Sequence, residues 1–155
     1  MTTADRGAPS TCLDEGEIRI LKSLLGDTIL SVDGQEGGVV ESAYLRLADS
    51  IIELAAVWVP RSVWFYTVGF PWRISPRVWD LGTVFSSPLL TDIADVGTVT
   101  AIDVYADDGD VEVALALRLA NERTLWVTCA GGDHVAPSLD KNNEVWHATK
   151  VSRTL

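Results

Sequence analysis

The alternation of apolar and polar residues along the chain predicts a mostly antiparallel β protein. Residues 111–119 carry Val or Leu at every second position, with Glu, Ala and Arg between them. A two-residue period is typical of strands that have one buried face and one wetter face. Similar segments bounded by turn residues predict further strands. These lie near residues 28–33, 39–47, 51–59, 62–69, 98–106, 124–130 and 144–151.

Two segments carry the signals of short helices. Asp14 and Glu17 have the spacing of a capping box, and the apolar residues that follow share one helical face, so a helix is expected over 14–25. A serine followed by Pro88 has the pattern of an N-cap with proline at the first helical position, which predicts a second helix over 88–95. A glycine stands where each of the two helices should end.

Each predicted helix precedes four predicted strands, and the two sets of elements are similar in sequence. Residues 45–49 (LRLAD) recur as residues 117–121 (LRLAN), and residues 28–33 (TILSVD) line up with residues 98–103 (TVTAID). The order of the matches is the same in both parts of the chain. The expected fold class is therefore α+β, mainly antiparallel β, with an internal duplication of an αββββ unit. The alternative is coincidence, since hairpins rich in Leu, Ala and Val resemble one another.

The chain is expected to form one domain, because 155 residues can bury a core without disulfides or metals. Residues 1–13 are polar and predict a flexible N-terminal tail. Residues 14–155 would form a single globular domain made of two similar halves, 14–69 and 87–151. A connector containing aromatic residues and arginine, residues 70–86, would join the halves.

Charge and cysteine content narrow the classes of partner and compartment. The net charge of −10 repels phosphate backbones and anionic membranes, so neither nucleic acid nor a membrane is an expected partner. The first residues lack the apolar stretch of a secretory signal, and no apolar run approaches the roughly 20 residues that span a bilayer. Cys12 and Cys129 have no disulfide-framework spacing and are expected as free thiols. These features predict a cytoplasmic protein.

The segment from residue 54 to residue 79 differs from the rest of this acidic chain. It contains no Asp or Glu, whereas it holds four of the six tryptophans. Arg and Trp are enriched where a few side chains supply most of a binding energy. Trp72, Arg73, Arg77 and Trp79 are therefore the candidate residues for binding a partner or an anionic ligand. In the alternative interpretation the tryptophans fill the core and the arginines pair with distant carboxylates.

The remaining motifs give no catalytic, cofactor or metal site. Residues 107–110 (DDGD) fail the ligand positions of an EF-hand and fit a hairpin turn better. Asp133 and His134 could form an acid–base pair, but the sequence supplies no nucleophile beside them. Two cysteines and two histidines are too scattered for a zinc site, and glycine-rich nucleotide motifs are absent from the sequence. The sequence therefore favours a protein that is not an enzyme and needs no cofactor.

Three functional hypotheses follow. The first is a non-enzymatic cytosolic protein that binds a protein partner, a basic one that it inhibits or sequesters as an antitoxin or immunity protein does. The second is a binder of a small molecule or anionic ligand, or an enzyme, with a pocket between the halves that Trp64, Trp146, Arg73 and Arg77 would border. The third is a homo-oligomer that associates through an alanine-rich sheet face or exposed tryptophans.

Overall fold

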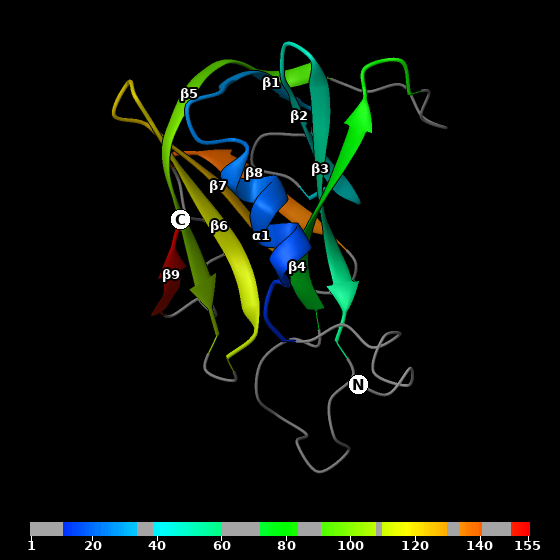
Figure 1. Ribbon diagram of the computed structural model, residues 1–155, viewed down its shortest axis with the longest axis vertical. Helices are drawn as coiled ribbons and strands as arrows, with labels where there is room; N and C mark the ends of the chain where they lie inside the picture. The colour runs from blue at the N-terminus through cyan, green and yellow to red at the C-terminus, as the bar shows by residue number, and fades with distance from the viewer. Residues whose placement is uncertain are drawn as a thin grey trace.

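The structure, a computed structural model, contains one helix and nine strands in its described part (Figure 1). It describes residues 11–33, 39–59, 72–83, 91–107, 110–129, 134–140 and 150–155. The helix is α1 (Glu15–Lys22). The strands are β1 (Thr28–Asp33), β2 (Ser42–Arg46), β3 (Ser50–Trp58), β4 (Trp72–Asp80), β5 (Thr91–Ala106), β6 (Glu112–Leu119), β7 (Thr124–Cys129), β8 (Val135–Leu139) and β9 (Lys150–Thr154). The predicted mainly antiparallel β class is confirmed.

The predicted capping box at the start of α1 is confirmed. The Glu17 backbone N–H donates to Asp14 Oδ1 at 2.7 Å, and the Asp14 backbone N–H donates to Glu17 Oε1 at 3.0 Å. The helix ends at Lys22, earlier than expected, and Leu21 and Leu24 are fully buried. The amphipathic face of α1 therefore anchors it to the core.

The nine described strands join one antiparallel sheet in the order β4-β3-β2-β1-β5-β6-β7-β8, and β9 also pairs with β5. The long strand β5 links two meanders, because its first part pairs with β1 and its later part with β6 and β9. Figure 1 shows β5 curving across the top of the molecule, with α1 in front of β4. The sheet curls so that β4 contacts β6 and β7, and both meanders contribute to one core.

The second predicted helix is wrong within the described residues, since Thr91–Ala106 is one strand. Ile93 and Ala94, which were expected to be helical, pair with Val32 and Ser31 of β1. Pairing with a buried neighbouring strand outweighs the local helix signal. Gly97, expected to close that helix, lies inside β5 with a φ of 126°, where a Cβ atom would lie 3.1 Å from the side-chain nitrogen of Asn121.

Residues 72–80 of the expected connector 70–86 also belong to the sheet. They form β4, which pairs with β3 from Ser50↔Asp80 to Trp58↔Trp72. Pro76 has no backbone N–H to donate, and it is accommodated because β4 lies at one end of the sheet order. The segment therefore positions its tryptophans and arginines on a strand.

The second half of the chain contains a further difference. Strand β8 lies in a part of the chain where no strand was expected, and β9 overlaps the end of the strand expected over 144–151, whose earlier residues lie outside the described part. The strand expected over 62–69 lies outside the described residues. The fourth strand of each meander thus comes from a segment that the sequence pattern did not mark.

The two meanders have the same strand order, and each contains an ion pair at an equivalent position. Asp33 of β1 pairs with Arg46 of β2 at 3.0 Å, and Asp103 of β5 pairs with Arg118 of β6. In each case the arginine lies two residues beyond the aspartate's cross-strand partner. An αββββ repeat is nevertheless not confirmed, because residues 91–95 belong to strand β5 and not to a helix. Internal duplication stays a prediction.

Candidate functional site

The four residues singled out in the sequence all lie on β4, but they do not form one cluster. Trp72 begins the strand and Trp79 lies near its end, on opposite sides of the central Pro76. Arg73 is buried, whereas Arg77 is exposed. The structure therefore separates Trp72 and Arg73 from the pair formed by Arg77 and Trp79.

Arg73 joins β4 to the start of α1. Its Nη1 atom lies 3.0 Å from both carboxylate oxygens of Glu17 and donates to the backbone carbonyl of Ile74 at 3.0 Å. The Ser75 hydroxyl donates to the same Glu17 carboxylate at 2.5 Å. The side chains of Arg73 and Glu17 are only 5% and 12% exposed, so this is a shielded ion pair. Arg73 thus has the surroundings of a structural residue.

Arg77 and Trp79 form an accessible cation–aromatic pair. The guanidinium carbon of Arg77 lies 5.5 Å from the centre of the Trp79 ring, within the range of a cation–π interaction. No ion pair of Arg77 with a carboxylate occurs in the described part of the chain, although Glu53 lies directly opposite on β3. Its N–H groups are therefore available to a binding partner.

Glu53 holds this pair in place through hydrogen bonds. The indole Nε1 of Trp79 donates to Glu53 Oε1 at 2.9 Å, and the Ser42 hydroxyl donates to Glu53 Oε2 at 2.6 Å. Both carboxylate oxygens are thus engaged within the protein. Glu53 fixes the Trp79 ring and leaves Arg77 to interact with other groups.

Tyr44 extends this surface onto β2, because it lies directly opposite Glu53. Its neighbours Ala43 and Leu45 are fully buried, so the alternation of the strand places Tyr44 on the other face of the sheet. Burial raises the pKa of the Tyr44 hydroxyl, and the charge of Glu53 raises it further. Tyr44, Glu53, Arg77 and Trp79 are called the Arg77–Trp79 surface below.

Trp72 belongs to a second aromatic pair at the opposite end of β4. Its ring meets that of Trp58 edge to face, with the ring centres 5.4 Å apart and an angle of 84° between the planes. Trp58 is 53% exposed and lies directly opposite Trp72 on β3. Among the described residues, no exposed arginine lies next to this pair, because Arg73 is buried.

The other groups with possible chemistry do not assemble into a site in the described residues. His134 is half-buried, while Asp133, His147 and residues 108–109 lie outside the described part of the chain. Neither Cys12 nor Cys129 forms a disulfide, as expected, and burial raises the pKa of the Cys129 thiol strongly. No group of three potential metal ligands occurs among the described residues.

Comparison with known proteins finds no matching family model, curated protein or solved structure. No helix in the described segments has the length and apolar character needed to cross a bilayer.

The Arg77–Trp79 surface is suited to binding. It joins the Trp79 ring and the exposed Arg77 guanidinium on β4 to a tyrosine on β2, with Glu53 of β3 between them. Aromatic residues and arginine are enriched at binding hot spots. Exposed apolar side chains, Val78 and Leu81, lie at the same end of β4. Composition identified Arg77 and Trp79, but Tyr44 and Glu53 could be found only from strand register.

Proposed function

We propose that the protein is a non-enzymatic cytosolic binding protein that engages a basic protein partner, which it inhibits or sequesters in the manner of an antitoxin or immunity protein. The Arg77–Trp79 surface is the centre of the contact. The observation that carries this proposal is the exposed Arg77 guanidinium stacked on an indole that Glu53 holds in position.

The fixed geometry of this surface supports binding because little side-chain freedom remains to be lost. The Trp79 ring is restrained by a hydrogen bond on one side and by the Arg77 guanidinium over its face. Ordering a flexible side chain at an interface costs about 0.5–1.5 kcal/mol, and a preorganised side chain avoids most of that cost. Arg77 can then donate to a carboxylate or backbone carbonyl of the partner in a defined direction.

Overall charge supports a basic partner. The chain carries 22 acidic and 12 basic residues, so its long-range field attracts a cationic protein. Electrostatic attraction of this kind raises the association rate, while the buried centre of an interface determines the dissociation rate. The acidic surface thus selects the class of partner, and the Arg77–Trp79 surface supplies the local contact.

Affinity capture from the native cell lysate with three versions of the protein tests this proposal. The variants are Arg77→Ala/Trp79→Ala and the matched control Trp58→Ala/Arg123→Ala, which also removes one tryptophan and one exposed arginine. A stoichiometric basic protein should co-elute with the parent and with the control, but not with the Arg77/Trp79 variant. Circular dichroism must show that all three are folded. Equal capture by both variants would remove this surface as the binding centre.

A further inference from the structure

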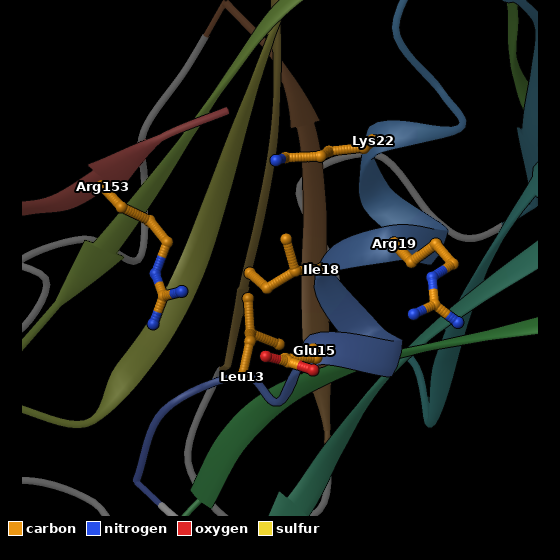
Figure 2. Close-up of a pocket in the computed structure, with 6 residues that line it drawn as sticks. All are labelled: Leu13, Glu15, Ile18, Arg19, Lys22 and Arg153. Atoms are coloured by element: carbon orange, nitrogen blue, oxygen red, sulfur yellow. The ribbon is translucent and has the colours of Figure 1, made fainter.

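A pocket of about 390 Å³ lies between α1 and the C-terminal strand β9, away from the Arg77–Trp79 surface (Figure 2). Its volume falls within the range of roughly 300–1,000 Å³ that is typical of small-molecule sites. The lining residues come from the segment before α1, from α1 itself and from β9. They are Leu13, Glu15, Ile18, Arg19, Lys22 and Arg153.

The centre of the pocket is apolar. Figure 2 shows the side chains of Leu13 and Ile18 side by side between the helix and the strands. Leu13 is 5% exposed and belongs to the hydrophobic core, against which Ile18 also packs. The pocket floor is therefore continuous with the core and rigid enough to hold a compact apolar group.

Two cationic side chains extend over this floor from opposite walls. Figure 2 shows Lys22 reaching out from α1 and Arg153 from β9, whereas the guanidinium of Arg19 is directed away on the far side of the helix. No ion pair of Lys22 occurs among the described residues. Lys22 thus offers its ammonium group to a ligand.

A buried carboxylate fixes the position of Arg153. Its Nε and Nη2 atoms each donate to the Glu112 carboxylate at 3.1 Å, and the backbone N–H of Leu13 donates to the same carboxylate at 2.7 Å. Glu112 is fully buried, and its charge is balanced by Arg153, whose side chain is 36% exposed. The Nη1 group of Arg153 takes no part in this pair and is oriented without further ordering.

We propose that this pocket binds a small organic anion with a single carboxylate or phosphate head and a compact apolar body. The head contacts Lys22 and the Nη1 group of Arg153, while the body lies on Leu13 and Ile18. Glu15 is the one carboxylate among the described residues that line the pocket, and it disfavours a second negative charge. The site differs from the pocket expected between the halves, because neither Arg73 nor Arg77 lines it; Trp64 and Trp146 lie outside the described residues.

Titration of ¹⁵N-labelled protein with octanoate, followed by NMR, tests the proposal. Octanoate should shift the amide signals of α1 and β9. Octan-1-ol lacks the negative charge and acetate lacks the apolar body, so each should bind at least about tenfold more weakly than octanoate. Octyl phosphate in place of octanoate shows which anionic head is preferred.

Two variants that each remove one exposed cation locate the head group. Lys22→Gln should weaken octanoate binding about tenfold, since a charge-assisted hydrogen bond is lost. Arg123→Gln, which removes a cation that does not line the pocket and that pairs with Asp140, should change it less than about twofold. The proposal is overturned if octan-1-ol binds as tightly as octanoate, if the two variants weaken binding equally, or if neither octanoate nor octyl phosphate shifts α1 at about 10 mM.

Discussion

We predict that the shielded ion pair between Glu17 and Arg73 contributes strongly to the free energy of unfolding. Neutralising Glu17 should lower that free energy more than neutralising Arg73. Glu17 accepts hydrogen bonds from Arg73, from the Ser75 hydroxyl and from the Asp14 backbone N–H. Glu17→Gln keeps an acceptor for these donors but removes the negative charge. The Arg73 guanidinium, 5% exposed, then loses the counter-charge that Glu17 supplies.

The size of the effect follows from this burial. Leaving one charge of a buried pair uncompensated costs about 3–5 kcal/mol, a large part of the roughly 5–15 kcal/mol that stabilises a typical domain. Arg73→Met should cost less than Glu17→Gln, because the Glu17 carboxylate is 12% exposed and keeps two donors. The double variant Glu17→Gln/Arg73→Met should also cost less than Glu17→Gln alone, since no buried charge remains unpaired.

Urea unfolding followed by tryptophan fluorescence measures these differences. Glu15→Gln is the matched control, because Glu15 also lies in the first turn of α1 but is exposed, and its loss should cost less than about 1 kcal/mol. The reasoning is refuted if Glu17→Gln costs no more than Glu15→Gln. It is equally refuted if the double variant costs the sum of the two single changes.

Two further predictions concern titratable groups. The Glu53 charge disfavours the tyrosinate form of Tyr44, so Glu53→Gln should lower the Tyr44 pKa toward its usual value. Absorbance at alkaline pH, with the Tyr44→Phe variant as a blank, measures this pKa. An unchanged or higher pKa would be inconsistent with the contact between Glu53 and Tyr44. Burial raises the Cys129 pKa, so the unfolded chain loses that proton first and stability should fall as pH rises above the unfolded thiol pKa of about 8.5. Cys129→Ala should reduce that alkaline slope in urea unfolding, and an identical slope would show that Cys129 does not cause it.

Local sequence patterns predicted the helix and strands whose structure depends on neighbouring residues in the chain. The Asp14–Glu17 capping box and the alternation in β6 specify structure within a few residues, and both predictions are confirmed. The helix expected over 88–95 failed because pairing of Ile93 with β1 depends on a strand far away in the chain. The strand β4 was likewise not predicted, because it contains Pro76. A proline suits a strand only at the edge of a sheet, and that position depends on the rest of the fold.

The candidate binding residues were predictable by type but not by arrangement. The absence of acidic residues near Arg73 and Arg77 in the sequence suggested that both arginines were available to a ligand. Arg73 instead pairs with Glu17, 56 residues earlier, whereas Arg77 remains exposed over Trp79. Only the three-dimensional arrangement distinguishes the two arginines.

The most direct test of the central claim is the affinity of the purified, captured partner for the parent and for Arg77→Ala/Trp79→Ala, measured at low and at high salt. If the Arg77–Trp79 surface is the centre of the contact, the double variant should lose at least about 2 kcal/mol of binding free energy at both salt concentrations. The control Trp58→Ala/Arg123→Ala should bind like the parent, and the affinity of all three proteins should fall with salt because the net charge of −10 attracts the partner. A folded Arg77→Ala/Trp79→Ala variant that binds the partner as tightly as the parent would contradict the claim.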